Sequence, residues 1–191
     1  MRECVGGRQP SDGRKHVELV VPPYGYCDFN PASIPAPYCE AIGRVSIAWA
    51  TVEQSVETGL RLMARIDLRT AAIMFAHASL PQRLDQLVAL AVEWLEPDVA
   101  AKVKALRSRV DALAGLRNDL VHCEWFMQRS TGRVLMRKVR ARGALKTELR
   151  HYEVPDIVRL ATDAHALSLD IFVFFDDIRL AKGLPDETLD K

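Results

Sequence analysis

The amino-acid sequence predicts an all-α protein, a four-helix up-down bundle with a small antiparallel β-ribbon inserted before the last helix. Apolar residues recur at three- and four-residue steps in long stretches from residue 38 onward, as on one face of an amphipathic helix. Between residues 124 and 153 this period stops, and β-forming residues flank two turn signals. The connections between the helical stretches are short, which favours antiparallel neighbours in a bundle.

The first 37 residues are predicted to form an extended arm. Six of the ten prolines fall in this segment, together with several glycines. Proline fixes its own backbone angle and lacks an N–H donor, so such a segment does not form a continuous helix. Residues 16–21 are compatible with a short strand.

Three of the four long helices follow the arm. They are predicted over residues 38–66, 79–96 and 98–122, and a short helical piece covers residues 70–77. Pro81 suits the first turn of the second long helix, and Asp98 can cap the third. Their apolar faces consist of Ile42, Val45, Trp49, Val52, Val56, Leu60 and Met63, then Leu84, Leu87, Val88, Ala91 and Leu95, then Val99, Val103, Leu106, Val110, Leu113 and Leu120.

The β-ribbon and the last helix complete the predicted architecture. Ser130-Thr131-Gly132 and Arg142-Gly143-Ala144 are the two turn signals of the ribbon. Pro155 opens the last helix, and a Gly-Leu-Pro sequence at 183–185 stops it. The predicted organisation is therefore an N-terminal arm (1–37), a helical domain (38–183) with the ribbon at about 124–153, and an acidic tail (184–191).

Composition limits the classes of function. The chain has 191 residues, 49% of them hydrophobic and 27% charged, which is typical of a soluble globular protein. Its net charge of +1 means that binding to nucleic acid would require a local basic patch. The four cysteines lack the spacing of a metal site, and we predict neither a metal nor a cofactor. No signal peptide or membrane-spanning run is recognised, so a cytoplasmic protein without membrane contact is expected.

A six-residue motif at the end of the third long helix is the main candidate for a catalytic site. It reads Arg117-Asn118-Asp119-Leu120-Val121-His122. Arginine can hold a phosphate through a planar fork of donors, and histidine can transfer a proton near neutral pH. Together they suit RNA cleavage by attack of the 2′-hydroxyl on the adjacent phosphorus, a reaction that requires no metal and that DNA cannot undergo.

Helical geometry and an ordinary structural role both bear on this interpretation. Asn118 and His122 share one face, whereas Arg117 lies about 140° around the helix axis from His122. The two side chains are therefore expected to diverge. The long arginine side chain can swing partly round, but a second copy of the helix in a dimer would complete the site more easily. The alternative is a plain helix end, because Arg and His near a C-terminus also complement the helix dipole.

The motif resembles the R-x4-H motif of the HEPN superfamily in its Arg-Asn variant. The resemblance extends over residues 38–181, although only the motif is specific. It implies a metal-independent endoribonuclease that acts as a homodimer, with Arg117 and His122 catalytic and Asn118 supporting. It also implies a toxin or antiviral-defence setting with a possible antitoxin or regulatory partner. Cys123 and Glu124 depart from the Gly and Tyr that some members carry there, and the superfamily includes inactive binding members.

A concentration of basic residues in the ribbon favours RNA as the partner. Only Glu148 opposes eight Lys and Arg residues between positions 129 and 150, and Trp125, Phe126 and Tyr152 flank them. Such residues suit phosphate contact and base stacking. The alternative is a solvated ribbon whose charges prevent edge-to-edge aggregation. The RNA-binding residues predicted here are Arg129, Arg133, Arg137, Lys138, Arg140 and Arg142.

These observations lead to two functional hypotheses. The first is a metal-independent endoribonuclease whose substrate is RNA. The second is a non-catalytic, HEPN-like dimer that binds RNA, a nucleotide or a protein partner.

Overall fold

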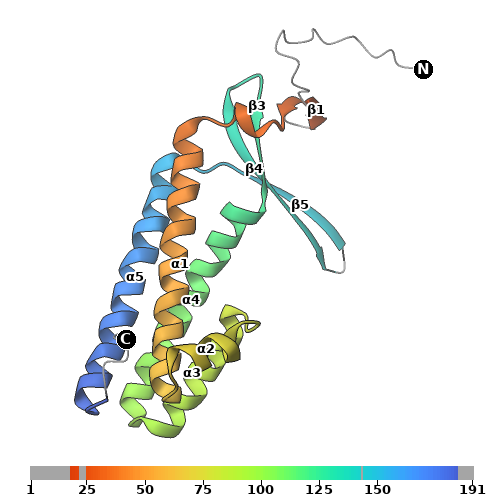
Figure 1. Cartoon of the computed structure of the whole chain (residues 1–191). Coiled ribbons are helices and arrows are strands. Elements are labelled where there is room, and N and C mark those ends of the chain that lie inside the picture. The colour runs from red at the N-terminus through yellow and green to blue at the C-terminus, as the bar shows by residue number, and fades with distance from the viewer. Residues whose placement is uncertain (1–17, 22–24, 143, 185–191) are drawn as a thin grey trace. The chain divides into compact units, whose positions relative to one another are not determined.

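Two compact units make up the chain. The computed structural model describes residues 18–21, 25–142 and 144–184, with side chains for residues 25–140 and 146–184. The helical unit comprises Ala36–Cys123 and Glu153–Lys191, and the sheet unit comprises Met1–Pro35 and Glu124–Tyr152 (Figure 1). Most of the predicted acidic tail and the first 17 residues of the predicted arm lie outside the described residues.

The helical unit contains five α-helices in the described part of the chain. They are α1 (Ala36–Ala64), α2 (Leu68–Phe75), α3 (Leu80–Trp94), α4 (Pro97–His122) and α5 (Val154–Ala181). The short α2 belongs to the fold, because Ala71 and Phe75 are buried in the core. Asp67 caps it by accepting from the Thr70 backbone N–H at 2.9 Å, and hydrogen bonds from Thr70 lower the pKa of this carboxyl.

The prediction of an up-down bundle is wrong, because α1 and α5 run parallel (Figure 1). Thr51 donates to Ser168 Oγ at 3.3 Å, and Gly59 lies against Phe175, so residue numbers rise together along both helices. Helix α4 runs antiparallel to both, since Arg117 lies over Trp49 of α1 and Arg109 pairs with Asp170 of α5. The strict alternation of directions therefore fails between α1 and α4, where the chain passes through the short α2 as well as α3.

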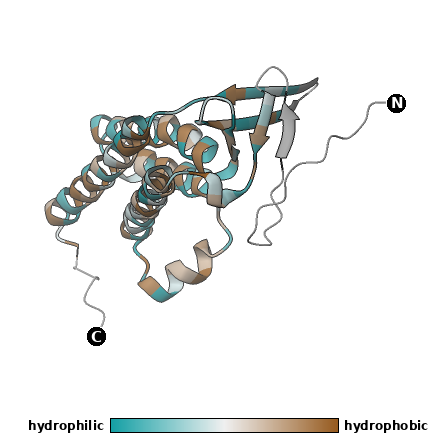
Figure 2. Ribbon diagram, turned by 90° about the horizontal axis from the view of Figure 1, so that it is seen from above, coloured by the Kyte–Doolittle hydropathy of each residue, from teal (hydrophilic) through white to brown (hydrophobic). Residues whose placement is uncertain are grey.

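One hydrophobic core is shared by all five helices. Brown and teal stretches alternate along the long helices in Figure 2, as expected for amphipathic helices. The apolar face that the sequence predicts on the first helix is buried as expected, including Val45, Val52, Val56 and Leu60. Opposite it lie Leu167, Ile171 and Phe175 of α5. Apolar packing along α1 therefore fixes the frame on which α4 and its motif are held.

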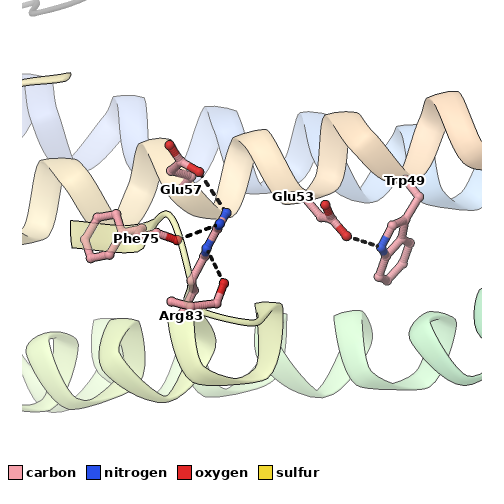
Figure 3. A network of polar contacts seen from close by, with 6 residues as sticks. Trp49, Glu53, Glu57, Phe75 and Arg83 are labelled. Atoms are coloured by element: carbon pink, nitrogen blue, oxygen red, sulfur yellow. Dashed lines mark hydrogen bonds and ion pairs between the residues drawn. The ribbon is translucent and has the colours of Figure 1, made fainter. Parts of the chain in front are cut away.

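Arg83 of α3 connects the turn after α2 to helix α1 through hydrogen bonds and an ion pair. It donates through Nε to the Ala78 carbonyl at 3.1 Å, and through Nη2 to the Phe75 carbonyl at 3.0 Å (Figure 3). Its Nη1 lies 2.7 Å from Glu57 Oε2 of α1. One side chain thus satisfies two carbonyls at the end of α2 and pairs with a carboxylate.

Helix α1 is in close contact with Phe175 of α5 at Gly59. A Cβ atom at this position would lie 2.5 Å from Phe175 Cδ2 and 2.6 Å from Cε2. The Phe175 side chain is only 2% exposed, so it has little room to move away. Close contact at this point therefore requires a residue without a side chain.

Replacing Gly59 by alanine is expected to lower the free energy of unfolding by about 1–3 kcal/mol, because the new methyl group overpacks the core. Gly43→Ala is the matched control in the same helix, since a Cβ there meets no atom within 4 Å. That control is expected to stabilise the protein by about 0.5–1 kcal/mol through helix propensity. Urea unfolding followed by circular dichroism measures both; equal effects of the two substitutions would contradict the prediction.

The sheet unit is a five-stranded antiparallel sheet in the order β1-β2-β3-β4-β5. Its strands are β1 (Glu18–Val21), β2 (Gly25–Asp28), β3 (Glu124–Gln128), β4 (Arg133–Arg142) and β5 (Ala144–Arg150). The predicted ribbon corresponds to β3, β4 and β5. The all-α fold class is wrong, because residues assigned to the extended arm supply two further strands and enlarge the ribbon to a sheet with its own core.

A buried carboxylate joins the N-terminal strands to the ribbon. Cys27 and Asp28 of β2 pair with Gln128 and Met127 of β3. Asp28 is fully buried; its carboxylate contacts Arg129 Nη2 at 2.5 Å and accepts from the Asn30 backbone N–H at 2.9 Å. Pro31 opens the 3₁₀ turn η1 (Pro31–Ser33), a position that suits proline.

Candidate functional site

The three predicted catalytic residues lie in the last two turns of α4, and their side chains meet. Arg117 donates through Nη1 to Asn118 Oδ1 at 3.1 Å, and the same nitrogen lies 3.1 Å from His122 Nε2. A guanidinium can only donate hydrogen bonds, so Nε2 is the acceptor in this contact when the ring is the tautomer with its proton on Nδ1. A guanidinium, an amide and an imidazole therefore form one connected group.

The expected divergence of Arg117 and His122 is wrong. An angle of about 140° around the axis describes where the two side chains leave the helix, and not where they end. The arginine side chain is long enough to reach around α4 to the imidazole. One helix is therefore sufficient to bring the two groups together, and their contact does not depend on a second copy of the chain.

Trp49 of α1 lies beneath the arginine. The guanidinium carbon is 5.9 Å from the centre of the Trp49 ring, a cation–π distance. Trp49 in turn donates from Nε1 to Glu53 Oε1 at 2.8 Å (Figure 3). Arg117 Nε is buried and has no hydrogen-bond partner among the described residues. The indole thus supports the guanidinium from below. Because Nε is buried, the Nη atoms of Arg117 are the donors that can reach a ligand.

The motif exposes two of the three predicted catalytic side chains. Asn118 and His122 are exposed and Arg117 is half-buried, whereas Asp119 and Leu120 are buried. Helix α4 ends directly after the motif, where the Cys123 N–H donates to the Asp119 carbonyl at 3.2 Å. Among the described residues, the hydrogen-bond partner of the His122 ring is the Arg117 side chain and not a backbone carbonyl. An exposed imidazole of this kind is accessible to a substrate.

The predicted RNA-binding residues divide into two groups. Arg129 pairs with the buried Asp28, and Arg137 pairs with Glu124 and lies 5.4 Å above the Phe29 ring. These two arginines have structural partners inside the sheet. Arg133 and Arg140 are exposed and Lys138 is half-buried. Arg142 belongs to β4, but its side chain lies outside the described residues.

Sequence reasoning missed two kinds of residue. Trp49 was expected only in the core, and no local pattern links it to a motif 68 positions later. Lys146 and Arg150 were left out of the predicted RNA-binding set. The two-residue alternation of a strand could have found them, because they fall on the same face as Lys138 and Arg140.

Comparison with protein-family models, with curated proteins and with solved structures found no match for this chain. No helix in the described residues has the length and apolar character needed to cross a membrane. Within the same residues, no three His, Cys, Asp or Glu side chains are grouped so that they could hold a metal ion.

Proposed function

We propose that the Arg117–His122 site cleaves RNA by attack of the ribose 2′-hydroxyl, as a metal-independent endoribonuclease. The observation that supports this proposal is the 3.1 Å contact between Arg117 Nη1 and Nε2 of the exposed His122 imidazole. A phosphate-binding group and a proton acceptor are thus already side by side. Such pre-arranged geometry is what general base catalysis needs.

The proposed reaction assigns one task to each group. A phosphate that binds the Arg117 Nη atoms takes over the donor now shared with His122, which frees Nε2 to remove the 2′ proton. The 2′-oxygen then attacks phosphorus, and the bond from phosphorus to the 5′-oxygen breaks. The imidazolium returns its proton to the leaving 5′-oxygen, while Arg117 stabilises the charge on the phosphoryl oxygens. Asn118 holds the guanidinium in place.

The biological setting in this proposal comes from the HEPN resemblance. It includes a homodimer that brings two motifs to one RNA, a cytoplasmic location, and a role as a toxin or defence nuclease under a regulatory partner such as an antitoxin.

A non-catalytic function is the second candidate, and one observation favours it. Arg117 Nη1 contacts both Asn118 Oδ1 and His122 Nε2, so these three side chains have partners without a substrate. In that case the protein would be a HEPN-like module that binds RNA, a nucleotide or a protein partner.

Incubation of the purified protein with labelled RNA in EDTA tests the proposal. Cleavage is expected to continue and to leave a 2′,3′-cyclic phosphate on one fragment and a 5′-hydroxyl on the other. The matched substrate carries a 2′-deoxynucleotide at the cleaved position and is expected to resist cleavage there. Intact RNA after incubation, or cleavage at the deoxy position, would favour the second candidate or a different reaction.

A further inference from the structure

The positive charges of the β4–β5 hairpin are concentrated on one face. Residues directly opposite one another in an antiparallel pair point to the same side of the sheet. The register pairs Met136 with Arg150, Lys138 with Glu148, and Arg140 with Lys146. Trp125 pairs with Met136 from the other side. We call the resulting surface the cationic face, formed by Trp125, Lys138, Arg140, Lys146, Glu148 and Arg150.

The outer end of the cationic face places two positive charges directly opposite each other. Arg140 and Lys146 are cross-strand partners, and both are exposed. Neither side chain forms an ion pair with another described residue. Like charges in this arrangement destabilise a hairpin. A local conflict of this kind is typical of a surface that serves binding.

The single acid of this face does not neutralise it. Arg150 donates through Nε to Glu148 at 2.7 Å, and this hydrogen bond lowers the pKa of Glu148, with further contributions from the charges of Arg140 and Lys138. Four cations therefore surround one carboxylate that is already engaged. The face keeps a net positive charge in a chain whose total charge is +1.

Aromatic rings border the inner end of the same face. Trp125 and Tyr152 are half-buried, with ring centres 6.3 Å apart at 49°. Arg150 Nη1 donates to the Tyr152 hydroxyl at 3.4 Å, which links the rings to the charged residues. Cations followed by aromatic rings suit a strand whose phosphates and unpaired bases are both accessible, and bases in a duplex are not available for stacking.

We propose that the cationic face of the β4–β5 hairpin binds single-stranded nucleic acid, so that unpaired RNA is the substrate class of this protein. Phosphates occupy the outer end at Arg140 and Lys146, and a base stacks near Trp125 and Tyr152. The inference rests on the proposed function only for the step after binding, since phosphate contact and stacking do not require a 2′-hydroxyl.

The substitution Lys146→Glu is expected to change the stability of the protein and its affinity for nucleic acid in opposite directions. The substitution converts a like-charge pair into an attractive one, so the melting temperature is expected to rise. Binding of a fluorescent single-stranded oligonucleotide, measured by anisotropy, is expected to weaken about tenfold or more because a phosphate contact is replaced by repulsion. A purely structural role for Lys146 would not couple a more stable hairpin to weaker binding.

A matched reversal, Lys102→Glu on the exposed surface of α4, controls for net charge. It is expected to leave the affinity nearly unchanged. The double substitution Arg140→Gln and Lys146→Gln is expected to weaken the dependence of binding on salt. The slope of log affinity against log salt concentration should fall in magnitude by about 1.4, at about 0.7 per lost phosphate contact. Equal loss of affinity in the Lys102→Glu protein would overturn the proposal.

The choice of probe separates this inference from the nuclease proposal. Single-stranded DNA of the same sequence has no 2′-hydroxyl, so it reports binding without cleavage and is expected to bind with an affinity similar to that of RNA. Tighter binding to duplex RNA, or equal competition by polyglutamate, would overturn the inference whether or not RNA is cleaved. Binding without cleavage would instead contradict only the nuclease proposal.

Discussion

Replacement of His122 by alanine is expected to lower the rate of RNA cleavage by about 10²–10⁴-fold, the usual contribution of a general base. The imidazole is the basic group of the motif, and its Nε2 lies 3.1 Å from Arg117 Nη1. Because His122 is exposed at the end of α4, its removal leaves the core intact and the melting temperature nearly unchanged. Single-turnover cleavage of labelled RNA in EDTA measures the effect on the chemical step.

His165→Ala provides the matched control, because this histidine is also exposed on a helix but lies on α5, away from the motif in sequence. It is expected to cleave RNA at the rate of the wild type. Arg117→Ala is expected to cost about 10²–10³-fold through loss of phosphoryl charge stabilisation. Full activity in the His122→Ala protein would exclude the proposed role of the imidazole, even if RNA is cleaved in EDTA.

Replacement of Arg83 by methionine is expected to reduce the free energy of unfolding by about 2–4 kcal/mol, because a half-buried ion pair and two hydrogen bonds are lost together. The side chains of Arg83 and Glu57 are only 18% and 21% exposed, so water replaces the lost partners poorly. The Phe75 and Ala78 carbonyls also lose their donor. Denaturant unfolding at constant pH measures the change.

Two further substitutions define what Arg83 contributes. Arg83→Lys keeps the charge beside Glu57 but cannot donate to two carbonyls, so it is expected to have an intermediate effect. Arg109→Ala removes an ion pair with Asp170 whose partners are 50% and 53% exposed. An exposed pair of this kind contributes only about 0–1 kcal/mol. If Arg83→Met were no more damaging than Arg109→Ala, the turn after α2 would not depend on this side chain.

Local patterns in the sequence predicted most helices and the three ribbon strands, because each depends on residues close together in the chain. The first helix was expected over residues 38–66 and is observed at Ala36–Ala64. The sheet was incomplete in the prediction because β2 pairs with β3 about 100 positions later. The Asp28–Arg129 pair that secures this junction has a sequence separation of 101, and no local period reveals it.

The side-chain contacts of the candidate site could likewise be predicted only in part. Residue types and spacing identified Arg117, Asn118 and His122, but backbone geometry alone placed the first and last on different sides of the helix. The contact depends on the conformation of a flexible arginine, and that conformation depends on Trp49 in another helix. Support of this kind, from a residue on another helix, can be recognised only when the packing of the helices is known.

The parallel pairing of α1 and α5 has a consequence for how the protein is made. Thr51 and Ser168 meet across 117 positions of sequence, so the largest apolar face of α1 has no final partner until α5 has been synthesised. Pairings this distant close large loops and slow the folding search. In a nascent chain that has completed α1 to α4, the apolar residues of α1 that pack against α5 lack that cover, and we expect chaperones to bind the chain at that stage.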